Sequence, residues 1–243
     1  MTDSLALIII FIATLGQVLF GFGGGLIAIP LLSLIVGVHN AVTLALVLQL
    51  VSGILVWRIR ADLRWAVLWP TLGGLVIGTT TGLFFLSLAN ESFLRLFLAA
   101  FIILFLIKSQ FFGELSFPIL NRPGGGGVVG LVAGLLQGLI GSGGPPLVIY
   151  LSETIKDKAA MRAGLLFLLF VANCLRLPLS VSTDLFNSDV IRLSIAAIPC
   201  FVVAIFLGHR THHLLSERQY HLALRVILIV STALLIFKSL PHL

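Results

Sequence analysis

Long apolar runs, each separated from the next by a short polar stretch, fill almost the whole chain. A helix needs about 20 apolar residues to cross a bilayer, and runs on this scale recur along the sequence. Six are uninterrupted, at 41–57, 66–90, 92–107, 160–181, 190–207 and 222–240, and two are broken by glycines, at 5–37 and 127–151. The pattern predicts an all-α polytopic membrane protein of about eight helical segments.

The composition agrees with this prediction. Hydrophobic residues make up 59% of the 243 residues and charged residues only 10%, whereas soluble domains carry about 25% charged residues. A net charge of +6 would suit a nucleic-acid partner in a soluble protein, but here the basic residues lie in short loops between apolar runs. Membrane topology explains that placement. We therefore expect a multi-pass protein in contact with the lipid bilayer and no nucleic-acid partner.

The first glycine-broken run is too long for one straight helix. Residues 5–37 would extend about 50 Å, against a hydrocarbon core of about 30 Å. The break falls at Gly21–Gly25, because consecutive glycines weaken a helix and permit positive φ. This predicts a helical hairpin of 5–20 and 25–37, with its tip inside the membrane and Pro30 early in the second arm.

A second break, Gly141–Pro146, has the sequence GSGGPP and lies 120 residues further along the chain. At the same offset Gln17 is matched by Gln137 and Gly24 by Gly144, and three long apolar runs follow each break. This order indicates an internal duplication. The predicted divisions are 1–108 for the first transmembrane repeat, 109–127 for a linker and 128–243 for the second repeat.

The distribution of basic residues favours hairpins over single crossings. If each glycine-broken run crossed once, the basic clusters at 156–162 and 210–225 would lie on the opposite side from the cluster at 58–64, against the positive-inside rule. If each run returns to its own face, all three clusters lie in the cytoplasm. A hairpin plus three crossings reverses the second half, so the two repeats are predicted to be inverted. Both termini would then lie outside.

The glycine breaks also predict an anion site. A helix that restarts inside the membrane offers free amide groups and the positive end of its dipole, and proline suits its first positions. If the hairpins enter from opposite faces, their tips meet near the midplane between the repeats. The alternative is that the glycines only allow tight packing. The predicted substrate-binding residues are Gly23, Gly24, Gly25, Ser142, Gly143, Gly144, Pro145, Gln17, Gln137, Gln49, Asn173, Arg176 and Tyr150.

Two roles are possible for the polar residues of this set. Each amide or hydroxyl side chain could instead be an interhelical hydrogen-bond partner. Arg176 could extend to the interface or supply a fixed positive charge to the cavity. No Asp or Glu lies deep within a predicted span, so we expect no carboxylate proton relay. Export of an anion does not require one, since outward movement gains about 2.3 kcal/mol per charge per 100 mV of negative-inside potential.

The remaining reactive side chains indicate no metal and no cofactor. Cys174 and Cys200 fall in predicted spans without CxxC spacing or nearby histidines, which is typical of packing residues. The histidines map to loops or to the ends of spans. A response to pH or a metal is open to several of them, but a basic interfacial loop explains them more simply.

At the two breaks the chain resembles the TauE/SafE family of membrane permeases. The resemblance rests on GFGGGLIAIPLLSL at 21–34, GLLQGLIGSGGPPLVIYLS at 134–152 and LGHR at 207–210. It implies a permease in the bacterial cytoplasmic membrane that exports a small anion, sulfite or an organosulfonate. The motif does not carry the identity of the anion.

Other functions remain open at this point. An anion channel, an importer of a small carboxylate or sulfonate, or a structural membrane subunit would share the same hydropathy. An intramembrane hydrolase is suggested by Ser142 between glycines, but Ile140 occupies the first glycine position of the Gly-x-Ser-Gly pattern. We therefore predict no enzyme and no catalytic residue. The pattern does not decide between a monomer and a homodimer.

Overall fold

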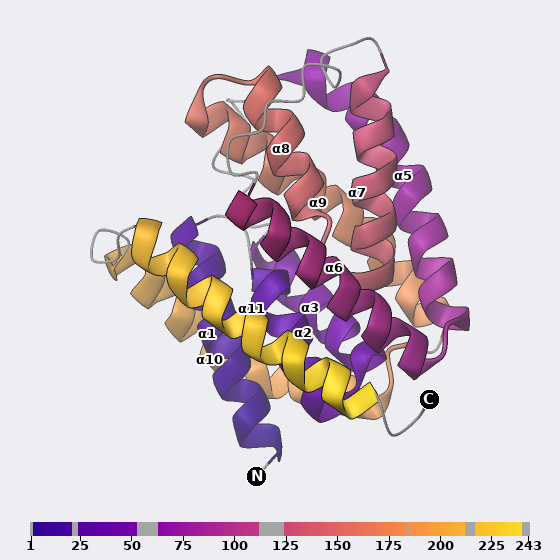
Figure 1. Cartoon of the computed structure of the whole chain (residues 1–243), viewed down its shortest axis with the longest axis vertical. Helices are drawn as coiled ribbons and strands as arrows, with labels where there is room; N and C mark the ends of the chain where they lie inside the picture. Colours follow the sequence, from indigo (N-terminus) through magenta and orange to yellow (C-terminus); the bar gives the residue numbers. More distant parts are fainter. Residues whose placement is uncertain are drawn as a thin grey trace. The chain divides into compact units, whose positions relative to one another are not determined.

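The computed structural model (Figure 1) describes residues 2–20, 24–52, 63–111, 124–183, 185–211 and 217–239. Within these ranges the chain forms helices and no strands. The helices are α1 (Thr2–Phe20), α2 (Gly24–Val36), α3 (Val38–Ser52), α5 (Trp65–Leu88), α6 (Glu91–Phe111), α7 (Gly125–Ile140), α8 (Gly144–Thr154), α9 (Lys158–Ser182), α10 (Ser188–Thr211) and α11 (Glu217–Ser239). The predicted all-α class is confirmed. The two broken runs each contribute two helices.

Two of the described helices are long and apolar enough to cross a membrane. They are Trp65–Leu88 and Ala159–Ser182, which match the predicted spans 66–90 and 160–181. Several others are apolar but shorter, among them Gly24–Val36 and Gly125–Ile140. Short apolar helices are what a broken run produces.

The second glycine break interrupts the helix where the sequence predicts, whereas residues 21–23 of the first break lie outside the described residues. α2 begins at Gly24 and α8 at Gly144, 120 residues later. The 13 residues of α2 and the 11 of α8 extend only about 20 and about 16 Å, less than a hydrocarbon core of about 30 Å. Each short helix packs on the helix before it, α2 on α1 and α8 on α7. Pro30 lies in the second turn of α2, as predicted.

One compact unit comprises Gln49–Leu88 and Glu114–Asp184. Its central contact joins α5 and α7 (Figure 1), and glycines on both helices bring the two backbones together. A Cβ on Gly74 would lie 2.0 Å from the carbonyl oxygen of Gly127, and one on Gly78 would lie 2.2 Å from that of Leu131. Such a stripe of small residues is typical of close helix packing in membranes.

The other compact unit comprises Met1–Leu48, Ala89–Gly113 and Leu185–Leu243. In it α1 packs on α10 and α2, while α11 packs on α6 and α2. Each unit therefore draws helices from both sides of the predicted linker. The compact units group the helices by spatial contact and not by order in the sequence, so they do not test the predicted repeats at 1–108 and 128–243. That division stays a prediction.

Candidate functional site

The chain reverses direction sharply between α7 and α8. Gly141 ends α7 in the left-handed conformation, with φ of 65°, which glycine adopts without the strain of a Cβ. The amide of Gly141 donates to the carbonyl oxygen of Gln137 at 3.0 Å, and the amide of Ser142 donates to that of Leu136 at 3.3 Å. The last carbonyls of α7 are thus satisfied, and α8 restarts three residues later.

The side chain of Gln137, in the last turn of α7, forms hydrogen bonds that stabilise this reversal. Its Oε1 accepts a hydrogen bond from the amide of Gly143 at 2.7 Å. Its Nε2 donates to Gln49 Oε1 at 2.7 Å and to Asn173 Oδ1 at 3.0 Å. Gln137 is buried, so these bonds replace the water that a polar amide loses in the interior.

Gln49 and Asn173 complete a closed amide network with Gln137. Gln49 Nε2 donates to the carbonyl oxygen of Gly141 at 3.1 Å. Asn173 Nδ2 donates to Gln49 Oε1 at 2.9 Å and to the carbonyl oxygen of Leu169 at 2.8 Å. Each of the three side chains both donates and accepts, which favours one defined arrangement. The end of α3, the α7–α8 break and the middle of α9 meet at this network.

Arg176 adds a positive charge to the amide network. It follows Asn173 on α9, is fully buried, and donates from Nη1 to Asn173 Oδ1 at 3.1 Å. A guanidinium keeps its charge and directs several donors in one plane. Of the two readings of Arg176, an interfacial cation and an internal one, the geometry favours the internal one.

The glycines at the start of α8 differ in their surroundings. A Cβ on Gly143 would lie 2.4 Å from the carbonyl oxygen of Ala133, so Gly143 is required for packing against α7. A Cβ on Gly144 would have nothing within 4 Å. Pro145 and Pro146 carry no amide hydrogen, and the amide of Gly143 already donates to Gln137. The amide of Gly144 is therefore the backbone donor that a ligand could accept from at the start of α8. Ser142, beside it, is buried.

The first glycine break repeats one feature of the second. A Cβ on Gly24 would lie 2.1 Å from Gln17 Oε1, so the glutamine of α1 covers the start of α2. Gly25 follows within α2, and Gly23 lies outside the described residues. Gln17 and Gly24 belong to the unit that begins at Met1. The predicted meeting of the two hairpin tips stays a prediction.

Tyr150, another predicted site residue, does not join the network. A Cβ on Gly126 would lie 2.7 Å from its hydroxyl oxygen and 3.1 Å from Thr71 Oγ1. Gly126 is at the opposite end of α7 from Gln137. Tyr150 therefore packs away from the α7–α8 break, because α8 runs back along α7.

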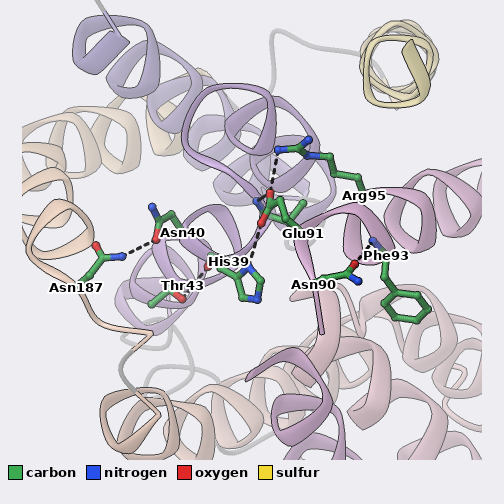
Figure 2. A network of polar contacts seen from close by, with 9 residues as sticks. His39, Asn40, Thr43, Asn90, Glu91, Phe93, Arg95 and Asn187 are labelled. Carbon is green, nitrogen blue, oxygen red and sulfur yellow. Dashed lines mark hydrogen bonds and ion pairs between the residues drawn. The ribbon is translucent and has the colours of Figure 1, made fainter. Parts of the chain in front are cut away.

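A second polar cluster was not singled out from the sequence. Figure 2 shows His39 and Glu91 pointing toward one another, with His39 Nδ1 2.9 Å from Glu91 Oε2. The sequence pattern places the histidines, His39 among them, in loops or at the ends of spans. Asn90 before Glu91 is a recognisable helix cap, and its Oδ1 accepts from the amide of Phe93 at 2.8 Å. The contact between residues 52 positions apart leaves no local signal.

Comparison with known protein families gives a match over nearly the whole chain. Residues 6–235 match the family model described as Sulfite exporter TauE/SafE, which covers nearly the whole chain. No curated protein and no solved structure was found to match. The matched range includes both glycine breaks and every residue of the amide network.

Proposed function

The chain belongs to the sulfite exporter TauE/SafE family, a family of multi-pass membrane permeases for anions, and we propose that it exports sulfite or an organosulfonate across the bacterial cytoplasmic membrane. The residues that bind the anion are, in this proposal, those at the α7–α8 break. Because the family is one of transporters, no residue is given a catalytic role.

The observation that carries the proposal is the buried guanidinium of Arg176 within the amide network. Sulfite and sulfonates present several oxygen acceptors on one anionic group, and guanidinium, amide and backbone donors suit them. Gly144 offers an amide donor beside unfilled space, at the positive end of the α8 dipole. Gln49, Asn173 and Gln137 hold these donors in place through their mutual hydrogen bonds.

The contact between Asn40 and Asn187 supports a hairpin at α7–α8. Asn187 Nδ2 donates to Asn40 Oδ1 at 2.8 Å, so both residues lie on one side of the membrane. An even number of crossings must separate them. If the segments that begin with α3, α5, α6 and α9 each cross once, the described helices supply four crossings, and α7–α8 would then return to its own face.

The contact between Asp3 and Arg192 extends the same reasoning to α1–α2. Arg192 Nη2 lies 3.3 Å from Asp3 Oδ2. If α7–α8 is a hairpin, the number of membrane crossings between Asp3 and Arg192 is even only if α1–α2 is also a hairpin. This supports two inverted repeats, with both contacts at the outer face and the second hairpin entering from the cytoplasm.

The experiment is flux of radiolabelled sulfite, and separately of a labelled sulfonate, in proteoliposomes. We expect Arg176→Gln to lower saturable flux at least about tenfold, which corresponds to about 1.4 kcal/mol of lost interaction, and Arg176→Lys to retain part of it. The matched control is Arg192→Gln, which removes an exposed arginine from an ion pair with Asp3 and should transport as wild type does.

Three results would contradict the proposal. Equal flux in wild type and Arg176→Gln would show that Arg176 on α9 does not bind the anion. Flux without saturation or counterflow indicates a channel. Counterflow that does not respond to a clamped membrane potential excludes uniport-like export driven by that potential.

A further inference from the structure

The carboxylate of Glu91 joins the start of α6 to the start of α3 (Figure 2). Its Oε2 lies 2.9 Å from His39 Nδ1, and its Oε1 accepts from the amide of Val38 at 2.5 Å. Val38 and His39 are the first two residues of α3. A carboxylate from another helix thus caps α3, where the free amides and the helix dipole favour negative charge.

The surroundings of the carboxylate are shaped to hold it. Arg95 Nη2, one turn along α6, lies 3.4 Å from Glu91 Oε1. Gly37 adopts a φ of 83°, and a Cβ there would lie 3.1 Å from the same oxygen. The left-handed turn between α2 and α3 therefore brings the backbone close to the carboxylate, an approach that only glycine permits without strain.

Glu91 remains ionised at neutral and mildly acidic pH. Burial opposes ionisation, but the hydrogen bonds from His39 and Val38 and the charges of His39 and Arg95 outweigh it, so the pKa of Glu91 lies below its ordinary value of 4.5. Histidine is the side chain whose charge changes between about pH 5 and 8. Of the two side chains, the imidazole is therefore the type that can take up a proton in that range.

The other charged groups of the neighbouring helices make their own contacts. Asp3 on α1 and Asp189 on α10 both lie near Arg192, at 3.3 and 3.7 Å. α2 carries no ionisable residue, and α11 carries none within its described side chains, 226–237. Glu91, on α6, faces His39, and Arg95, also on α6, faces Glu91.

The helix that starts at this cluster also carries a residue of the amide network. α3 is continuous from Val38 to Ser52, with His39 in its first turn and Gln49 in its last. Gln49 contacts Gln137, Asn173 and Gly141. One continuous helix therefore carries both His39 and Gln49.

We propose that His39 and Glu91 form a proton-binding site that regulates transport. When the imidazole takes up a proton from water, the hydrogen bond to Glu91 becomes an ion pair, and α3 is held more firmly on α6. Movement of α3 during the transport cycle is then slower at acidic pH. The inference rests on the proposed transport function, because it concerns the regulation of that transport.

The test is counterflow of a sulfonate that stays ionised throughout, measured at symmetric pH values from about 7.5 to about 5.5. Wild-type flux should fall about threefold on acidification, the effect expected of a partly exposed ion pair. His39→Gln keeps a hydrogen-bonding side chain but cannot take up the proton, so its flux should be nearly independent of pH. Asp3→Asn breaks a different ion pair of the same compact unit and should retain the wild-type profile.

A second measurement separates failure of this proposal from failure of the transport function. The unfolding temperature of the full chain in detergent is followed over the same pH range. Wild type should gain stability on acidification relative to His39→Gln, because the ion pair exists only in the folded protein. Identical pH profiles of wild type and His39→Gln, in flux or in unfolding temperature, overturn the proton site. Absence of flux in every protein, with the stability difference intact, overturns the transport function alone.

Discussion

The side chain of Gln137 accepts a 2.7 Å hydrogen bond from the amide of Gly143, six residues further along the chain. This bond closes the reversal between α7 and α8 and occupies one of the amides that a helix start leaves free. The same side chain donates to Gln49 and Asn173. One glutamine therefore supports both the hairpin and the buried network.

Replacing Gln137 by leucine should destabilise the protein and abolish saturable transport. The substitution leaves the amide of Gly143 and the acceptors of Gln49 and Asn173 without this partner, and an unsatisfied buried polar group costs about 1–3 kcal/mol. Thermal unfolding in detergent and counterflow in proteoliposomes measure the two effects. Thr80→Val, which removes an exposed hydroxyl bonded within its own helix, is the control. An unfolding temperature of Gln137→Leu equal to that of wild type would show that the bonds contribute nothing.

Alanine at two adjacent glycines should separate packing from ligand contact. Gly143→Ala places a Cβ 2.4 Å from the carbonyl oxygen of Ala133 and should lower the unfolding temperature. Gly144→Ala has open space around its Cβ, so it should fold as wild type does while raising KM for the anion. The measurement is saturation of flux beside thermal unfolding. An unchanged KM in Gly144→Ala would remove the start of α8 from the anion site.

A second adjacent pair tests the contact between α5 and α7. Gly74→Ala directs a methyl group to within 2.0 Å of the carbonyl oxygen of Gly127, whereas a Cβ on Gly73 meets nothing within 4 Å. Forcing extra volume into a tight contact costs about 1–3 kcal/mol. Gly74→Ala should therefore unfold at a lower temperature, and Gly73→Ala should not. Equal unfolding temperatures would mean that the two helices separate freely.

Glu91 should contribute stability that is lost in acid. Because the pKa of Glu91 is lower in the folded protein than its ordinary value of 4.5, its contribution is complete above that value and disappears as the pH falls through the folded pKa. Glu91→Gln should therefore be less stable than wild type at neutral pH and should lose less stability below about pH 4.5. Parallel acid-unfolding curves for the two proteins would contradict this assignment.

Local patterns in the sequence predicted most of the described helices and the second glycine break. The apolar runs at 66–90 and 160–181 correspond to α5 and α9. An apolar run of that length is recognisable in the sequence because it matches the thickness of the bilayer. The glycines at 141–144 interrupt their helix where expected, because the loss of helix propensity is a property of the residue itself. Gln137, Gln49, Asn173 and Arg176 could be selected as polar residues in apolar runs, since burying such groups has a high energetic cost.

The sequence by itself therefore determined the class of protein, the positions of the broken helices and the set of polar residues available to a site. Only the tertiary structure decided which of these residues meet. It placed Gln49 beside Asn173 and Tyr150 beside Gly126, and it showed that Gly143 serves packing while Gly144 borders open space. It also paired His39 with Glu91. The physical reason is that hydropathy and propensity act over a few turns, whereas these contacts join residues far apart in the chain and depend on how the helices pack.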